Sequence, residues 1–460
     1  MLKTFLSTLL IFVSFVSYSQ PAVQQVLNNP ALKHASVGIS VVDIANGKNV
    51  VSYNADKSLT PASVLKLVTT ATALESLGDN YRYRTDVAFD ANDPLRILVI
   101  GSGDPTLGSE VFSESSNVFF VNSVQQLNRT LSKNSQYSIY VVDNLFGYDG
   151  VSPEWTWIDM GNYYASGSYG VSIFDNSYRL TFSNELTLNN TGRDNGYIYG
   201  YIYGAPFSYD RAIRGNIPGG KSSFSIKGDI PDPGLLLGET LADYLKKEGY
   251  NIGEVKTARE DYLLGKCTPM NVKPAYKIGQ SVFTQLSRPL KEIIREINVE
   301  SNNHYAEHVL RTIGSNVSKS IYDNALDEAI EYLGEFWNSK GVDNSSLQMY
   351  DGSGLAPQNA VSPQFLTELL SYMYNDSRHS DAFVYSLPKA GQEGTLRAFM
   401  TNTKYNGKIF AKSGSIGGVQ CYAGYLIDGN KKYAFSIMIN KFNGTRAQVR
   451  GAIEQLLLSL

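Results

Sequence analysis

Two residues that can share a proton lie three positions apart near the amino terminus. Ser63 and Lys66 fall in the first turns of a predicted helix over 60–78, and this spacing places both side chains on one helical face. A serine attacks only after a base removes its proton, and a lysine is such a base when burial, nearby positive charge or a helix start lowers its pKa. The pair therefore predicts a nucleophile, Ser63, and its base, Lys66.

The same spacing also has a purely structural interpretation. A first-turn serine beside a lysine whose charged end reaches solvent is common on helices. Ser386 and Lys389 repeat the pattern with Pro388 between them, but no apolar helix begins there, so we set this second copy aside. Further motifs must decide whether Ser63 and Lys66 perform chemistry.

Two further motifs place polar groups where a substrate can meet them. Lys412-Ser413-Gly414 lies at the end of a predicted strand, where an ammonium and a hydroxyl can bind a carboxylate and Gly414 allows close backbone approach. Ser301-Asn302-Asn303 falls between two helical segments, so that a hydroxyl and an amide can reach one cleft. Each motif is weak alone, and their combination carries the signal.

Composition indicates an ordinary globular protein. The chain has 460 residues, 43% of them hydrophobic, and its 40 Lys+Arg and 43 Asp+Glu give a formal net charge of −3. The balanced charge and the lack of Lys/Arg runs argue against nucleic acid as a partner. Cys267 and Cys421 are too few for a CxxC-type zinc site, and their pairing and the oligomeric state stay open. We assign no metal and no cofactor.

The first twenty residues have the layout of a secretory signal peptide. Lys3 precedes an apolar run from Phe5 to Val16, and the small residues Ser17 and Ser19 follow. The run is too short to span a bilayer comfortably. We therefore expect a secreted or periplasmic protein that is soluble once residues 1–20 are removed.

The elements that must position the motifs form a sheet and two sets of helices. A hairpin turning at Asn46-Gly47, together with three strands over 407–440, predicts a five-stranded antiparallel sheet, with the first and last helices covering one face. Thr60 is the expected cap of the 60–78 helix, which Gly78 ends. Helical periodicity over 286–376 predicts a helical lobe, and residues 81–273 read as a β-rich insert in which 196–204 is a strand or hairpin.

The ordered set SxxK, SxN and KSG is the signature of penicillin-binding proteins and class A β-lactamases. The wider sequence resembles the D-alanyl-D-alanine carboxypeptidases of the S13 peptidase family over nearly the whole mature chain. The segments that carry the resemblance are TPASVLKLVTTATAL, GSGDPTL, WTWIDM, YDGSGL, LPKAGQEGTL and AKSGSIGGV.

The resemblance implies an α+β fold with a β-lactamase/DD-peptidase-like domain that carries a large insert of two smaller domains. The implied peptidase domain is 21–80 with 274–460, the first inserted domain is 81–175 with 237–273, and the second is 176–236.

The resemblance also implies a role for each site residue. Ser63 would be acylated with Lys66 as base, and Ser301 would relay a proton to the leaving amine. Asn303 would hold the substrate amide and Lys66. Lys412 and Ser413 would bind the terminal carboxylate. The backbone N–H groups of Ser63 and Ser415 would bind the oxyanion, and Gly414 lies between Ser413 and Ser415. Asp159 and Tyr164 would bind the substrate side chain. For Asp159 and Tyr164, a turn aspartate and a packed tyrosine without a role toward the substrate are an equally good interpretation.

The implied function is a serine DD-peptidase that cleaves D-Ala-D-Ala ends, and possible D-Ala cross-links, of peptidoglycan stem peptides, with β-lactam antibiotics as covalent inhibitors. The chain has Ala356-Pro357 where relatives often carry an arginine, so recognition of a diaminopimelate carboxylate is not implied. Two alternatives stay open. His304, Glu307 and His308 form an H-x-x-E-H pattern that some zinc metallopeptidases use, and a non-catalytic wall-binding protein would retain the same motifs.

Overall fold

The computed structural model describes residues 20–112, 116–183, 199–206, 208–216, 223–263, 276–319 and 323–460. The predicted signal segment, apart from Gln20, and Cys267 lie outside these ranges. Within them, no helix is long and apolar enough to cross a membrane. The chain divides into two compact units, which are described separately: Met1–Glu75, Ile294–Ser301 and Gly334–Leu460 form unit 1, and Ser76–Ile293 and Asn302–Leu333 form unit 2.

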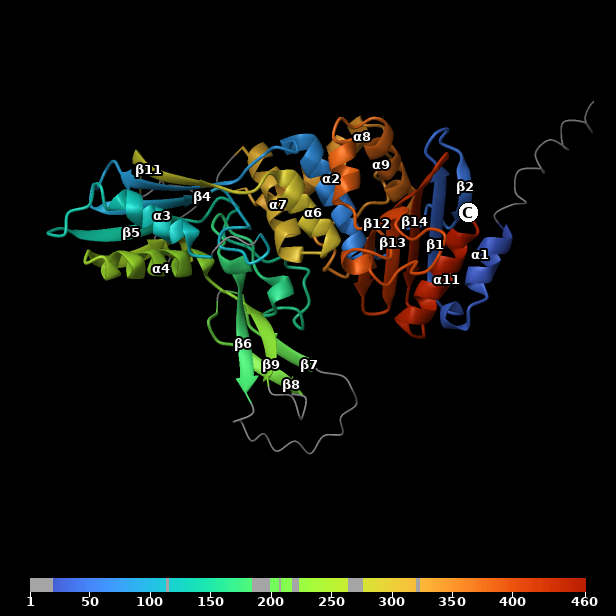
Figure 1. The fold of residues 1–460 in the computed structure, drawn as a ribbon, viewed down its shortest axis with the longest axis horizontal. Coiled ribbons are helices and arrows are strands. Elements are labelled where there is room, and N and C mark those ends of the chain that lie inside the picture. The colour runs from blue at the N-terminus through green and yellow to red at the C-terminus, as the bar shows by residue number, and fades with distance from the viewer. Residues whose placement is uncertain are drawn as a thin grey trace, which may run out of the picture. The chain divides into compact units, whose positions relative to one another are not determined.

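Unit 1 is built on the predicted five-stranded antiparallel sheet, in the order β12-β13-β14-β1-β2 (Figure 1). The hairpin turns at Gly47, whose φ of 70° suits glycine. The sheet joins both ends of the chain, and β12 is an edge strand with β13 as its neighbour. The strands are β1 Ser36–Asp43, β2 Asn49–Tyr53, β12 Ile409–Ile416, β13 Val419–Asp428 and β14 Lys431–Asn440.

Helices cover both faces of this sheet. Successive side chains of a strand point to opposite faces, so each face carries side chains that need cover. Val37, Ile39 and Val41 of β1 face a core that includes residues of the first and last helices, as predicted. On the opposite face, Ser40 Oγ lies 2.8 Å from Thr367 Oγ1 of α9. The helices wholly in unit 1 are α1 Gln20–Leu27, α9 Pro363–Asn375, α10 Ser380–Ser386 and α11 Arg446–Leu458, with the 3₁₀ turns η1 Pro30–Leu32, η2 Ala62–Leu65 and η5 Gly394–Leu396.

Three helices cross the division between the units: α2 Lys66–Leu77, α6 Leu290–Val299 and α8 Ala325–Ser339. Helices α6 and α8, with α7 Asn303–Val317 of unit 2 and α9, are the helical segments that the periodicity over 286–376 predicts, and α2 lies in the separately predicted helix over 60–78. Trp337 of α8 is fully buried, and its Nε1 donates to Thr72 Oγ1 of α2 at 2.9 Å. This bond ties the end of α8 to the helix that begins at Lys66.

Unit 2 contains a mixed five-stranded sheet in the order β10-β5-β4-β3-β11 (Figure 1). Helices α3 and α4 pack on one face of it. Residues 81–273, where they are described, contain more strand than helix, as predicted. Two small hairpin-like sheets, β6-β9 and β7-β8, complete the unit, and β7 confirms the strand interpretation of the tyrosine-rich segment where it is described.

The strands of unit 2 are β3 Arg84–Asp90, β4 Arg96–Gly101, β5 Gln136–Val142, β6 Ser177–Ser183, β7 Tyr199–Tyr203, β8 Ala212–Asn216, β9 Ser223–Asp229, β10 Asn251–Thr257 and β11 Ile278–Leu286. Its other helices are α3 Val118–Leu127, α4 Pro233–Lys247 and α5 Ala258–Leu263, with the 3₁₀ turns η3 Tyr163–Ala165 and η4 Phe174–Asn176. The three-domain division expected from the sequence stays a prediction.

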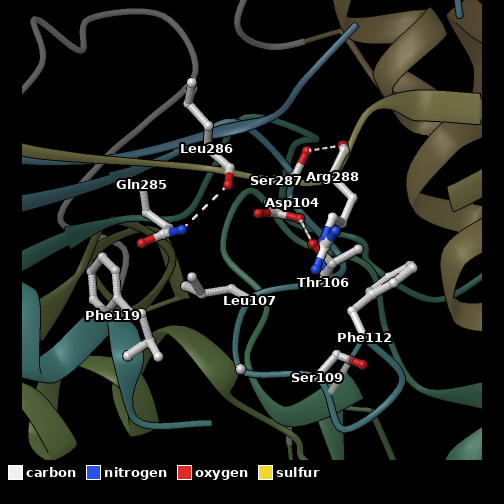
Figure 2. A pocket seen from close by; sticks show the side chains of 12 residues that line it. Asp104, Thr106, Leu107, Ser109, Phe112, Phe119, Gln285, Leu286, Ser287 and Arg288 are labelled. Atoms are coloured by element: carbon white, nitrogen blue, oxygen red, sulfur yellow. Dashed lines mark hydrogen bonds between the residues drawn. The ribbon is translucent and has the colours of Figure 1, made fainter. Parts of the chain in front are cut away.

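The GSGDPTL segment forms part of a pocket wall in unit 2. Asp104 accepts hydrogen bonds from Thr106 through both the backbone N–H, at 2.8 Å, and Oγ1, at 2.7 Å (Figure 2). Arg288 and Phe112 line the same pocket, whose empty volume is about 440 Å³ with its open mouth included. Asp104 thus closes a turn on Thr106 through its own side chain.

Candidate active site

Ser63 and Lys66 lie where a 3₁₀ turn becomes an α-helix. The turn η2 contains Ser63, and α2 begins at Lys66. The predicted cap is wrong, because Pro61 and not Thr60 is the residue that precedes the turn. The backbone of Thr60 is paired instead with the Asn440 side chain. In a 3₁₀ turn, side chains three apart are eclipsed, which brings the two groups closer than an α-helix would.

Lys66 is in contact with the candidate nucleophile. Its Nζ lies 3.0 Å from Ser63 Oγ and donates to the backbone carbonyl of Ser353 at 2.6 Å. The Lys66 side chain is fully buried, whereas Ser63 is half-buried and lines a pocket. A buried amine beside a solvent-accessible hydroxyl is the arrangement that serine activation requires.

The loop that presents Ser353 is a part of the site that the sequence reasoning missed. The buried carboxylate of Asp351 accepts the backbone N–H groups of Gly354, Leu355 and Ala356 at 2.7–2.9 Å. These bonds fix the loop and aim the Ser353 carbonyl at Lys66. The signal was available in the YDGSGL segment, because a short aspartate-glycine-rich sequence often folds around its own carboxylate.

Ser301 and Lys412 form the second half of the cluster. Lys412 Nζ donates to Ser301 Oγ at 2.9 Å and to the Ser413 carbonyl at 2.8 Å. Ser301 has a φ of 61°, a strained backbone conformation for a residue other than glycine. Lys412 is fully buried and is not among the residues that line the pocket, whereas Ser413 and Ser415 are.

The two lysines are electrostatically coupled. Burial, followed by repulsion from Lys66, holds the pKa of Lys412 well below its usual range. Glu300 opposes this effect. Lys66 therefore disfavours the charged form of Lys412.

Gly414 allows β12 to rest directly on the turn that carries Ser63. A Cβ at position 414 would lie 2.5 Å from the Pro61 carbonyl oxygen and 3.0 Å from the Val64 nitrogen. Ala62, just before the nucleophile, has a φ of 47°, so the backbone on both sides of this contact is tightly constrained. The close approach sets the position of Ser63 relative to the KSG strand.

We predict that Gly414→Ala slows acylation of Ser63 by roughly 100-fold, because a displacement near 1 Å in a reacting group has an effect of this size. Gly417→Ala is the matched control, since nothing lies within 4 Å of a Cβ there. The acylation rate with a fluorescent penicillin is the readout. Equal rates for the two variants would show that the Gly414 contact does not position the nucleophile.

One pocket in unit 1 joins these groups. Its empty volume is about 790 Å³, open solvent included, and its polar wall contains no acidic residue. The lining residues are Ser63, Ser301, Thr395, Ser413, Ser415, Gln420, Tyr422, Arg446, Ala447 and Arg450. The structure thus brings together Ser63, Lys66, Ser301 and the 412–415 strand as the sequence predicts.

Three predicted site residues belong to unit 2. Asn303 is the first residue of α7, and its Nδ2 donates to the Tyr164 carbonyl at 2.9 Å. The Tyr164 hydroxyl donates to Asp159 Oδ1 at 3.3 Å, and Thr156 Oγ1 donates to Asp159 Oδ2. Asn303, Tyr164 and Asp159 are therefore one connected group, and their roles toward a substrate stay predictions.

The H-x-x-E-H residues lie on α7 and are buried. Both ring nitrogens of His304 face serine hydroxyls, with Nδ1 3.2 Å from Ser166 Oγ and Nε2 3.0 Å from Ser172 Oγ. Nδ1 of His308 lies 2.9 Å from the Gly103 carbonyl. Within the described ranges, no group of three or more His, Cys, Asp or Glu side chains is arranged to hold a metal ion.

These histidines make stability depend on pH. Burial lowers the pKa of His308 to about 3 and lowers that of His304 as well. A depressed folded-state pKa means that the unfolded chain binds more protons below about pH 6.5, so the free energy of unfolding falls with acidification between about pH 6.5 and 3. Each histidine contributes about 1.4 kcal/mol per pH unit in that window.

We predict that the stability difference between the wild type and His308→Asn shrinks by up to about 2 kcal/mol between pH 7 and pH 5. Denaturant unfolding followed by fluorescence measures it. The exposed His34 provides the control substitution, His34→Asn. A wild-type to His308→Asn difference that is constant over this range would contradict the assignment of a buried neutral imidazole.

A serine with a buried lysine three residues on, a second serine, and a KSG edge strand of an antiparallel sheet are together typical of the penicillin-recognising serine enzymes. The sequence model of the D-Ala-D-Ala carboxypeptidase 3 (S13) family matches residues 19–196 and 206–458, and the chain belongs to this family.

Named relatives agree with this family membership, and a solved structure shares the fold. A D-alanyl-D-alanine carboxypeptidase of Actinomadura sp. (strain R39) is 26% identical over 92% of this chain and 81% of its own. A penicillin-sensitive carboxypeptidase A of Dictyostelium discoideum is 26% identical over 96% and 91%. The crystal structure of penicillin binding protein 4 from Haemophilus influenzae matches with a TM-score of 0.76 and 18% identity, over 95% of this chain and 97% of that one. The predicted fold class is confirmed.

Proposed function

We propose that this protein is a serine DD-peptidase that hydrolyses the D-Ala-D-Ala ends of peptidoglycan stem peptides through an acyl-enzyme on Ser63. The observation that carries the proposal is the 3.0 Å contact between Ser63 Oγ and the buried Lys66 Nζ. Family membership supports the substrate class. The apolar amino-terminal segment supports export to the compartment that holds peptidoglycan.

In the first step, Ser63 Oγ attacks the carbonyl carbon of the penultimate D-Ala and its proton passes to Lys66 Nζ. The Ser63 and Ser415 N–H groups would stabilise the oxyanion. Collapse of the tetrahedral intermediate breaks the C–N bond, and the proton on Lys66 passes through Ser301 Oγ, which Lys412 holds by a hydrogen bond, to the leaving amine. Lys66 is then neutral again and accepts a proton from the water that attacks the ester. As the ester C–O bond breaks, Lys66 returns this proton to Ser63 Oγ, and the shortened peptide leaves with a new carboxyl group.

The same chemistry explains expected inhibition by β-lactams. Attack of Ser63 on the lactam carbonyl opens the ring, but the leaving nitrogen stays tethered to the acyl group and cannot diffuse away. A long-lived ester on Ser63 is the expected product.

The proposed carboxylate anchor is tested by Lys412→Met, which keeps much of the buried volume. A bound carboxylate favours the ammonium form of Lys412 and so opposes the lowering of its pKa by burial. Losing this charge-assisted contact, worth about 1.5–3 kcal/mol, predicts a drop in kcat/KM of roughly 10- to 100-fold for a peptide ending in D-Ala-D-Ala. The loss should shrink for the same peptide with an amidated carboxyl end, since no anion is present. If both substrates lose equally, Lys412 acts through Ser301 alone and not as an anchor.

The function itself is tested with purified protein, a pentapeptide and a cross-linked muropeptide, followed by mass spectrometry of the products. Removal of one terminal alanine, unaffected by a chelator, is the expected result. Activity lost to the chelator and restored by zinc would support the H-x-x-E-H alternative. Penicillin acylation without any turnover would support a non-catalytic wall-binding protein.

A further inference from the structure

Two arginines on the last helix line the same pocket as the candidate nucleophile. Arg446 and Arg450 are four residues apart on α11, so their side chains lie on one helical face. Both are among the lining residues, together with Ser63 and Ser301. The catalytic motifs do not account for these two cations.

The Arg446 guanidinium is held in a fixed position. Its Nη1 donates to the Val419 carbonyl and to Gln420 Oε1, and its Nη2 donates to the Ile416 carbonyl, all at 3.2 Å. Gln420 Oε1 also accepts from Ser415 Oγ at 2.8 Å. Arg446 is thus joined to the KSG strand through the turn between β12 and β13.

Arg450 is the less restrained cation. Its Nε lies 4.0 Å from Glu454 Oε1, at the limit of an ion pair, and 38% of its side chain is exposed. Glu454 Oε1 also accepts the Met400 N–H at 2.8 Å. A partly exposed ion pair at this distance contributes little, so an incoming anion can compete for Arg450.

The order of groups along the strands gives the arginines a place relative to a substrate. Ser413 and Ser415 pair across β13 with Tyr422 and Gln420, and Gln420 contacts Arg446. In the proposed reaction, Ser63 attacks the reacting carbonyl, and Ser413 binds the carboxylate of the departing residue. Tyr422 lies opposite Ser413. Burial raises the pKa of the Tyr422 hydroxyl, and Arg450 is the cation that acts most strongly in the opposite direction and lowers this pKa. Arg450 therefore lies on the Ser413 side of the pocket, beside the expected position of the departing carboxylate.

We propose that Arg446 and Arg450 form an anion subsite for a second carboxylate on the leaving-group side of the scissile bond. This inference rests on the proposed function. A departing D-Ala has a single carboxylate, which is attached to the carbon next to the leaving nitrogen and therefore lies close to Ser63 and Ser413. The two arginines therefore favour departing residues that carry a further carboxylate over those that carry only one.

The test compares two synthetic peptides that end in D-Ala-D-Glu and D-Ala-D-Gln, which differ in one carboxylate and have nearly equal size. For the wild type we expect kcat/KM to be roughly tenfold higher with D-Glu, as suits one charge-assisted hydrogen bond. Arg450→Gln should bring this ratio close to one, and Arg450→Glu should invert it. Arg446→Lys keeps the charge but loses the fork that spans three acceptors, and should give an intermediate ratio.

Arg378→Gln is the matched control, because Arg378 is an exposed arginine of unit 1 outside the pocket lining, and it should keep the wild-type ratio. A wild-type ratio near one, or a ratio that Arg450→Glu does not change, would overturn the subsite while hydrolysis and penicillin acylation persist. Absence of both hydrolysis and acylation in the wild type would overturn the proposed function, and the subsite with it.

Discussion

Ser63→Ala should lower kcat/KM for a D-Ala-D-Ala peptide by about 10⁴-fold or more, since loss of a catalytic nucleophile leaves only binding and oxyanion stabilisation. The fold should be unaffected, because Ser63 is half-buried and its hydroxyl contacts Lys66 at the pocket wall. Steady-state kinetics together with a thermal unfolding curve measure both effects.

The second SxxK sequence supplies the control. Ser386 Oγ donates to the Phe383 carbonyl at 2.7 Å and accepts from Asn298 Nδ2 at 2.9 Å, while Lys389 is exposed. Ser386→Ala should keep nearly full activity, with a stability loss near 1 kcal/mol from the hydrogen bonds it removes. If Ser386→Ala and Ser63→Ala lose activity alike, the nucleophile has been assigned to the wrong motif.

Lys66→Met should slow acylation by penicillin by roughly 10²- to 10⁴-fold, the usual contribution of a general base. Methionine fills a similar volume and tolerates irregular surroundings, so the loss is chemical and not a packing defect. Lys66→Arg should also fail, because a guanidinium stays protonated and cannot accept the Ser63 proton. The second-order rate constant of acylation is the measurement.

Lys389→Met is the corresponding control for the lysine, since it removes the same group at the same spacing in the discarded motif. It should react with penicillin at the wild-type rate. A Lys66→Met variant that also reacts at that rate would show that another group accepts the proton, and Lys66 would then serve only to position Ser63 through the Ser353 carbonyl.

The sheet was predictable because its signals are local. The turn at Gly47 and the turn at Gly429, where φ is 60°, need glycine, and the apolar alternation of the intervening strands assigns each residue to a face. The Ser63–Lys66 contact was likewise predictable, since a spacing of three fixes it in any helical turn. The order of the motifs then identified the cluster.

What could not be predicted depends on contacts between distant segments. Thr60 has the sequence context of a cap, yet Asn440, 380 positions away, pairs with its backbone. The Ser353 carbonyl reaches Lys66 only because Asp351 folds its own loop. Arg446 enters the pocket because α11 packs beside the turn that follows β12. The YDGSGL sequence carries a local signal for its own loop, but no local pattern specifies the contact of that loop with Lys66 or the contacts of Thr60 and Arg446.

Acylation of Ser63 is tested by peptide mapping of the penicillin-treated protein with mass spectrometry. A single adduct of the mass of the intact penicillin is expected on the peptide that contains Ser63, absent from Ser63→Ala and retained in Ser386→Ala. An adduct on any other peptide, or an undiminished adduct in Ser63→Ala, would contradict it.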